Sequence, residues 1–317
     1  MVPILTVDAA EAGMKLIRFL ARRLLVCPAA GDLHRWIRTG QVRVNQKRAK
    51  AFDRLNAFDS VRLPPFALPK EKPQNRTDSE CPPLAAGDYL GGQIRILANT
   101  GDFLALEKTA GLPTQPGTGH SASVVSRLRE HFAKAVYIPA PAHRLDKNAS
   151  GILLAGKTHT AQEELHALFR SGGRDIEKIY LAWVEGAYPP DDAEMLLCDY
   201  LAKGETRTAA GCVVERMKIA GEREGKAARC RVSCLERRPL PCGKCASLLR
   251  IVLETGLTHQ IRIQLASRSF PIIGDTKYAG KPYPHMLLHA HSLRFPWHGE
   301  TFHLVSPPRW PEPFNLM

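Results

Sequence analysis

One stretch of the chain, residues 143 to 157, combines a turn with a buried strand. It reads His-Arg-Leu-Asp-Lys-Asn-Ala-Ser-Gly and continues into an apolar run from Ile152 to Ala155. A short apolar run bounded by turn residues predicts a buried strand. Asp146 would then lie at an edge, just before that strand. By residue type alone, the aspartate could equally cap a turn while Arg144 is a solvated surface charge.

Further strands come in runs along the rest of the chain. Apolar and alternating patterns predict strands over 94–97, 103–108, 178–185 and 248–253. Helical spacing predicts helices over 124–132 and 161–169. Because the helices do not alternate strictly with the strands, this order predicts an α+β fold and not a doubly wound parallel sheet.

The first 66 residues are strongly basic, with twelve lysines and arginines against five acidic residues. Helical spacing predicts a helix over 16–24 and a second one around 33–37 that Gly40 ends, followed by a short strand at 42–44. Since the whole chain carries a net charge of +13, this asymmetry favours a polyanionic partner. The candidate contacts are Lys15, Arg18, Arg22, Arg35, Arg38 and Arg43. A basic helical cap with solvated arginines is the alternative.

Composition also sets the domain boundaries. Residues 67–87 are polar and rich in proline without periodicity, which predicts a linker between a domain at 1–66 and a larger domain at 88–317. No apolar run of 18 residues occurs, and the first residues lack a basic-then-apolar leader. We therefore expect a cytoplasmic protein that acts away from membranes.

The cysteines raise the question of a metal site. Cys230, Cys234, Cys242 and Cys245 cluster, and the last two form a C-x-x-C. The first pair has instead the spacing of one face of a strand, and no second C-x-x-C follows. We expect no metal there.

The segment from His143 to Lys157 closely resembles the HRLDxxTSGxxxxAK signature of the RluA-type pseudouridine synthases, which isomerise uridine within RNA. The resemblance implies that Asp146 is the catalytic residue. Ala149 stands where the family usually has threonine, and Gly156 interrupts the usual Ala-Lys pair. The resemblance also implies a largely antiparallel central sheet with flanking helices.

Two further segments resemble elements of the same family. Residues 255–278 are similar to TGRTHQIRxH…GxPIxGDxxYG, which implies that Arg262 pairs with Asp146. A phosphate contact is the other reading of Arg262. Residues 178–180 are similar to a K-x-Y element whose tyrosine lies against the target base, which implies that role for Tyr180. By residue type alone, Tyr180 would be read as packing in a strand. Leu257 departs from the family's usual arginine, which removes a potential RNA contact.

The basic N-terminal region resembles the S4 RNA-binding domain that precedes the catalytic domain in many family members. The resemblance implies RNA as the partner, with large-subunit ribosomal RNA favoured over transfer RNA. Arg144 would occupy the space of the flipped base or contact a phosphate. His259 and His289 are read as hydrogen-bonded structural residues. We expect a monomer.

The resemblance implies that the N1–C1′ bond is cleaved, that the uracil turns and that C5 bonds to C1′. Whether Asp146 forms a covalent adduct or abstracts a proton stays open. No cofactor is expected, because nothing is oxidised, reduced or phosphorylated. Two other classes of protein fit the sequence less well. A non-catalytic RNA-binding protein would lack the Asp, Tyr and Arg set, and a glycosidase-like hydrolase would need two carboxylates, where the signature offers one.

Overall fold

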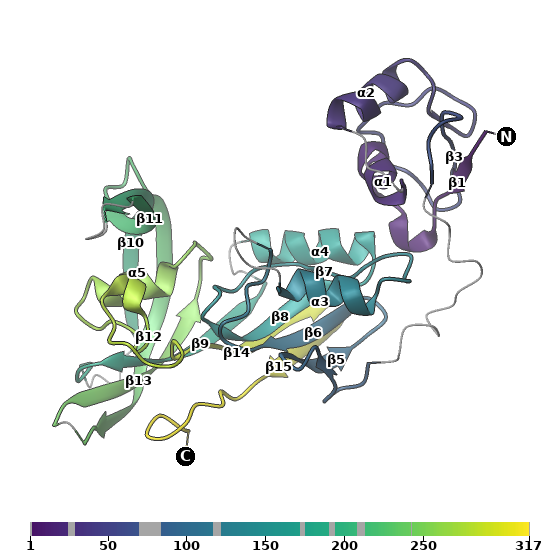
Figure 1. Ribbon diagram of the computed structural model, residues 1–317. Coiled ribbons are helices and arrows are strands. Elements are labelled where there is room, and N and C mark those ends of the chain that lie inside the picture. The colour runs from purple at the N-terminus through teal and green to yellow at the C-terminus, as the bar shows by residue number, and fades with distance from the viewer. Residues whose placement is uncertain are drawn as a thin grey trace.

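The computed structural model describes residues 2–24, 29–69, 84–116, 122–171, 175–189, 194–207, 213–241 and 243–316. Most of the predicted linker, at 70–83, therefore lies outside the described residues, as does Cys242. A small N-terminal module and the end of a long hairpin project to the same side from opposite ends of a large sheet (Figure 1).

The N-terminal module packs two short helices on a small antiparallel sheet of order β1-β3-β2. Its elements are β1 (Ile4–Thr6), η1 (Ala9–Glu11), α1 (Leu16–Arg23), α2 (Ala30–Arg38), β2 (Arg43–Val44) and β3 (Ser60–Arg62). The predicted helices and strand are confirmed. Leu16, Phe19 and Leu20 recur on one face of α1 and are fully buried, because one apolar stripe is enough to cover the core of so small a module.

The larger part is a mixed sheet of order β11-β10-β12-β13-β9-β14-β8-β6-β5-β4, in which β15 also pairs with β14 and β7 with β8. Its strands are β4 (Tyr89–Leu90), β5 (Ile94–Asn99), β6 (Phe103–Lys108), β7 (Ala140–Pro141), β8 (Ser150–Gly156), β9 (Glu177–Glu185), β10 (Met195–Arg207), β11 (Val213–Ala220), β12 (Lys226–Pro239), β13 (Cys245–Leu253), β14 (Leu288–Trp297) and β15 (Glu300–Val305). Helix α3 (Val124–His131) packs on one face of the sheet with Leu104, Leu106 and Leu153, and α4 (His159–Arg170) packs on the opposite face with Phe103, Ala105 and Leu154. The predicted α+β class with a largely antiparallel sheet is confirmed.

Strands β8 and β14 form the one parallel pair among the described strands, with Gly151 opposite Ala290. A side chain at Gly151 would overlap the Ala290 backbone, and the φ of Gly151 is +114°. Only glycine combines that φ with so close an approach. The pairing brings β14 beside the loop that precedes β8.

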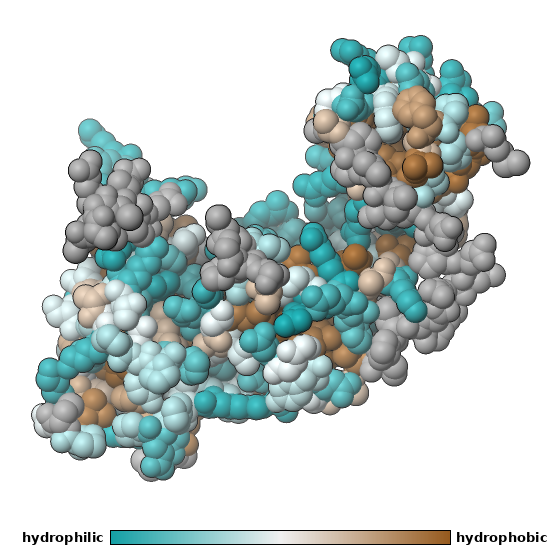
Figure 2. Space-filling view, viewed as in Figure 1, coloured by the Kyte–Doolittle hydropathy of each residue, from teal (hydrophilic) through white to brown (hydrophobic). Residues whose placement is uncertain are grey.

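Helix α5 (Gln260–Ala266) and the short helix η3 (Thr276–Tyr278) pack near the β10–β12 end of the sheet. The sequence patterns did not predict α5. It begins after His259, whose φ is +55°, so the chain turns sharply into the helix. Figure 2 shows that hydrophilic residues make up much of the face viewed, whereas the apolar strand residues are largely buried between the sheet and its helices.

Candidate active site

Asp146 lies in the loop between β7 and β8, as the pattern of the sequence predicted. Two interactions with the Thr114 hydroxyl hold the preceding residue: the Leu145 amide donates to Oγ1 over 3.1 Å, and Oγ1 donates to the Leu145 carbonyl over 2.9 Å. The Ala149 amide donates to the Asp146 carbonyl over 3.2 Å and closes a turn. The loop therefore presents the Asp146 carboxylate in a fixed direction.

Lys108, at the end of β6, holds the same loop from inside the protein. The side chain is fully buried, and its ammonium donates to the backbone carbonyls of Thr109, Leu112, Lys147 and Ala149. Burial lowers the pKa of Lys108 to about 7, although the nearby charge of Asp146 acts to raise it. The lysine thus joins two segments of backbone, the turn after β6 and the loop that carries Asp146. Sequence reasoning gave it no role, since a lysine ending a strand is ordinarily read as a surface charge.

The Arg262 guanidinium bridges two carboxylates. Its Nη1 lies 2.8 Å from Asp146 Oδ2, while Nε and Nη2 each lie 2.7 Å from an oxygen of Asp275. Burial acts to lower the pKa of Arg262, but the hydrogen bonds and charges of Asp275 and Asp146 raise it above its usual value. The arginine is therefore a permanent cation in a fixed orientation, bonded to the carboxylate that the sequence singled out.

Asp275 is the residue that sequence reasoning missed. It follows Gly274 in the quoted motif, but nothing in the spacing told which side chain it would face. It is 2% exposed and forms a bidentate pair with Arg262. Two parallel hydrogen bonds of this kind fix the orientation of the guanidinium and also neutralise its charge. We infer that Asp275 orients Arg262 toward Asp146.

We expect Asp275→Asn to lower turnover by about tenfold or more and to destabilise the fold by roughly 1–3 kcal/mol, since a buried charged hydrogen bond is lost. RNA affinity should change little. Asp199→Asn is a matched control, because Asp199 binds Arg268 through both oxygens at 2.9 and 3.1 Å away from this pocket. Tritium release and urea unfolding would measure both effects. Equal loss of turnover in the two variants would contradict the assignment.

A pocket opens beside the Asp146 carboxylate. Tyr180 on β9 forms part of its wall. Burial, and to a smaller extent the charge of Asp146, raises the pKa of the Tyr180 phenol, so that the phenol stays protonated at neutral pH. Apolar side chains complete the lining, namely Leu145, Ala149, Leu253, Leu257, Ile261 and Leu288. The pocket thus combines a flat aromatic ring and apolar walls with the Asp146 carboxylate and the Arg262 guanidinium. This combination suits a planar ligand with polar edges.

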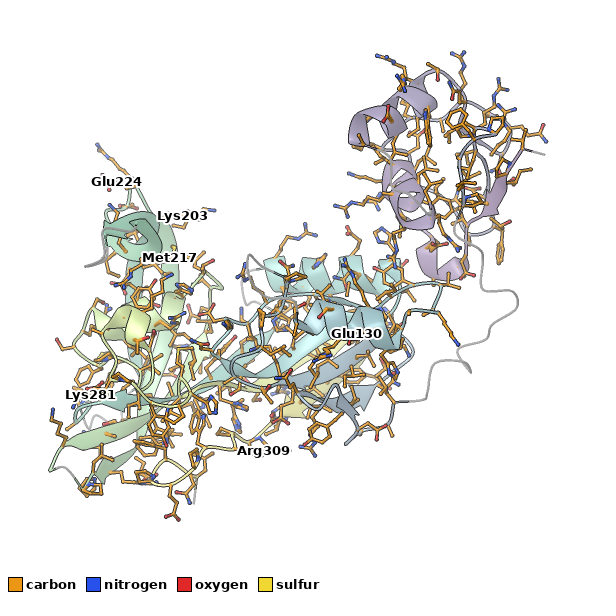
Figure 3. The ribbon with its side chains drawn as sticks, in the orientation of Figure 1. Glu130, Lys203, Met217, Glu224, Lys281 and Arg309 are labelled. Atoms are coloured by element: carbon orange, nitrogen blue, oxygen red, sulfur yellow. The ribbon has the colours of Figure 1, made fainter. Side chains whose placement is uncertain are left out.

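His259 lines the same pocket. Its Nε2 lies 3.8 Å from Asp146 Oδ2, and its Nδ1 lies 2.9 Å from the Tyr278 hydroxyl. Burial lowers the pKa of His259 to about 4, so that the imidazole is neutral at pH 7. The Tyr278 hydroxyl also accepts a hydrogen bond over 3.0 Å from the backbone amide of Met217, a residue of β11 labelled in Figure 3. Both His259 and His289 are hydrogen-bonded, as predicted. His289 is bonded to the Ser150 hydroxyl and to the Ser306 carbonyl.

The buried histidines make stability depend on pH. Burial lowers the pKa of His143 to about 3, and those of His259 and His289 to about 4. Between these values and about 6.5, the ordinary value, only the unfolded chain takes up these protons, so the free energy of unfolding should fall as pH falls through this window. Each histidine contributes at most about 1.4 kcal/mol per pH unit.

Urea unfolding at a series of pH values would measure this dependence. His143→Gln is the matched variant, because a glutamine oxygen can accept the Leu154 amide proton that His143 Nε2 now accepts over 3.1 Å. This variant should show a shallower dependence than the parent. Identical slopes for both proteins would refute the argument for His143.

The other residues singled out from the sequence lie in two places. Arg144 is exposed and lines the mouth of the pocket. The N-terminal cations lie in the separate module: Arg35 and Arg38 line a hollow with Arg48 and Lys50, and Lys15 lies over the Phe52 ring. Arg18 is exposed and Arg43 is half-buried.

Arg22 differs from the other N-terminal cations, because its guanidinium lies 4.3 Å from the centre of the Tyr137 ring, in the larger part of the chain. Tyr137 packs into the core of the N-terminal module. This contact joins the module to the body of the protein.

Within the described residues, no group of His, Cys, Asp and Glu is arranged to hold a metal ion. Cys230 is buried on β12 and faces Gln264, with its sulfur 3.4 Å from Oε1. Cys234 packs on the same core cluster, as the strand spacing predicted. No helix in the part of the chain that the structure describes is long and apolar enough to span a membrane.

Comparisons with known proteins agree with this site. Residues 102–267, which include Asp146, Tyr180 and Arg262, match the family model of RNA pseudouridylate synthases. Ribosomal large subunit pseudouridine synthase C of Salmonella typhimurium is 30% identical over 96% of this chain and 93% of its own length. The protein of the same name from Escherichia coli O6:H1 is 31% identical, with the same coverage.

Solved structures share the fold. Human RNA pseudouridylate synthase domain containing 1 superposes with a TM-score of 0.56 at 23% identity, covering 68% of this chain and 84% of the human one. The chain therefore belongs to the RNA pseudouridylate synthase family. It is an isomerase that converts uridine in RNA to pseudouridine.

Proposed function

We propose that this enzyme modifies uridine in the RNA of the large ribosomal subunit. The observation that carries the proposal is the extent of the match: relatives named ribosomal large subunit pseudouridine synthase C align with 96% of this chain, so that the N-terminal part is included. An enzyme that shares only the chemistry would match over the catalytic part alone. We also propose that the enzyme acts as a monomer in the cytoplasm.

We propose Asp146 as the catalytic residue, with Arg262 holding its carboxylate and Tyr180 lying against the base. The uridine flips out of its stack into the pocket, a step that costs a few kcal/mol. The N1–C1′ bond breaks, positive character develops on the sugar, and the carboxylate beside it stabilises or traps that charge. The uracil turns, C5 bonds to C1′, C5 loses its proton and N1 gains one. Arg144, at the mouth, fills the space that the base leaves or binds a phosphate.

The target can be tested by mapping pseudouridines in ribosomal and transfer RNA from cells with and without the gene. We expect one or more sites in large-subunit ribosomal RNA to disappear from the deletion strain and to return when the gene is restored. A gene carrying Asp146→Asn should not restore them. Loss confined to transfer RNA would overturn the proposed target while leaving the chemistry intact.

We propose that residues 1–66 form an RNA-binding domain, joined to the catalytic domain at 88–317 through the linker at 67–87. The hollow between α2 and residues 48–51 supports this, because exposed Arg35, Arg38, Arg48 and Lys50 converge there from two segments of the chain. Lys15, Arg18 and Arg43 add to the positive field of the module. Such clustering is the usual electrostatic footprint of RNA binding.

We expect Arg38→Gln combined with Arg48→Gln to weaken RNA binding and to reduce the dependence of log affinity on log salt by roughly 0.7–0.9 per lost phosphate contact. Charge variants are preferable to truncation, because removing the module would expose Tyr137. Filter binding across a salt series measures the slope. The control of equal charge combines Arg223→Gln with Lys226→Gln; Arg223 lies exposed between β11 and β12, and Lys226 is the exposed first residue of β12. An unchanged slope in the Arg38 and Arg48 variant would show that this hollow does not touch RNA.

A further inference from the structure

Lys178 is a buried cation that the site described above does not use. It lies on β9 and is 8% exposed. Its ammonium has no hydrogen bond or ion pair with any residue that the structure describes. Lys108 is the useful contrast, because that buried ammonium is surrounded by four carbonyls. Burying an ammonium without such partners costs free energy. Burial accordingly lowers the pKa of Lys178.

The position of Lys178 relates it to the pocket. Residues two apart on a strand point to the same side of the sheet, so Lys178 shares a face of β9 with Tyr180. The positive charge of Lys178 also acts on His143, which directly precedes Arg144. On the neighbouring strand β13, Val252 pairs with Ile179, and the next residue, Leu253, lines the pocket. Lys178 does not itself line the pocket, but it shares a face of the sheet with Tyr180 and lies on the strand beside Leu253, which both do.

A purely structural role does not explain a lysine at this position. A methionine or leucine would fill similar space without the cost of desolvating a charge, and replacing unpaired buried charge with apolar side chains generally stabilises proteins. Lys178 is largely buried but keeps 8% of its surface exposed, so an anion can reach it. The anionic group of RNA is its phosphate, which a lysine binds as a point charge.

We propose that Lys178 binds a backbone phosphate of the RNA next to the flipped uridine, and so positions the nucleotide against Tyr180 and Asp146. This rests on the proposed role of the pocket as the site that receives uridine. The cation is unpaired in the free protein because its partner arrives with the substrate. Lys178 is in this account an RNA-contacting residue that takes no part in bond breaking.

The test uses Lys178→Met and Lys178→Arg in the full chain, with Lys281→Met as the control. Lys281 lies at the far end of the sheet in Figure 3, and its ammonium is 4.0 Å from Glu185, so the control removes the same charge away from the pocket. RNA affinity is measured by filter binding, and turnover by tritium release. The RNA is a 5-tritiated transcript of large-subunit ribosomal RNA or of transfer RNA, whichever the parent modifies.

We expect Lys178→Met to weaken RNA binding about tenfold or more, the value of a charged hydrogen bond, and to lower the salt slope by roughly 0.7. The same variant should have a higher Tm than the parent, because an unpaired buried charge is gone. Lys178→Arg should recover part of the affinity, and Lys281→Met should bind as the parent does.

Two results would overturn the proposal. One is a Lys178→Met variant that binds RNA with parental affinity and salt slope, and the other is a variant whose Tm falls, which would give Lys178 a structural role. Failure of the pocket assignment is separable, because it would appear as substantial turnover in Asp146→Asn regardless of position 178.

Discussion

Asp146→Asn should reduce tritium release to the background of the assay while RNA affinity stays within a few-fold of the parent. Catalytic groups of this kind are worth about 10²- to 10⁴-fold in rate. An asparagine keeps the shape of the side chain, and its oxygen can still accept the Arg262 Nη1 proton now shared with Asp146 Oδ2 over 2.8 Å. The pocket should therefore stay assembled without the charge that performs the chemistry.

The matched control is again Asp199→Asn, which makes the same change at a carboxylate bound to Arg268. It should retain parental turnover. If Asp146→Asn kept substantial turnover, another group would have to be the catalyst, and the role proposed for the loop before β8 would be wrong.

Arg262→Met should have the largest combined effect on activity and stability. It removes the cation from between two carboxylates and leaves Asp275, 2% exposed, without its ion-pair partner. Breaking a buried ion pair in this way costs about 3–5 kcal/mol. Turnover should fall to background, because Asp146 loses the guanidinium that bonds its carboxylate and fixes its direction.

Arg262→Lys separates geometry from charge. A lysine supplies a cation but cannot reproduce a fork that bonds two carboxylates at once. We expect intermediate stability and strongly reduced turnover, measured by urea unfolding and tritium release. Parental turnover in Arg262→Lys would mean that charge alone matters. Weakened RNA binding at parental turnover would instead make Arg262 a phosphate contact.

The sequence predicted most of the elements and the central pair of the site. Periodicity located α1, α3, α4, β6 and β9, because each carries a complete apolar stripe or run. The family resemblance predicted that Arg262 pairs with Asp146, although the two lie 116 residues apart in the sequence. The structure has this ion pair, with Arg262 Nη1 2.8 Å from Asp146 Oδ2. The roles of these residues, and that of Tyr180, stay predictions until variants are measured.

What could not be predicted has a physical cause in each case. Helix α5 has only seven residues and follows His259, whose backbone is in the left-handed region. So short a helix does not show a recognisable helical repeat of apolar residues. The roles of Asp275 and Lys108 depend on which distant backbone or side chain each one meets, and a single sequence carries no such information. Lys178 lay within a quoted motif, but burial without a partner is visible only in three dimensions.

The parallel pairing of Gly151 with Ala290 has a consequence for the order of events during synthesis. A ribosome adds about 5–20 residues each second, so residue 290 follows residue 66 by roughly 10 to 45 seconds. The basic N-terminal module can fold during that interval, while the strand that flanks the Asp146 loop does not yet exist. A nascent chain would therefore complete the module proposed to bind RNA well before it completes the site that modifies RNA.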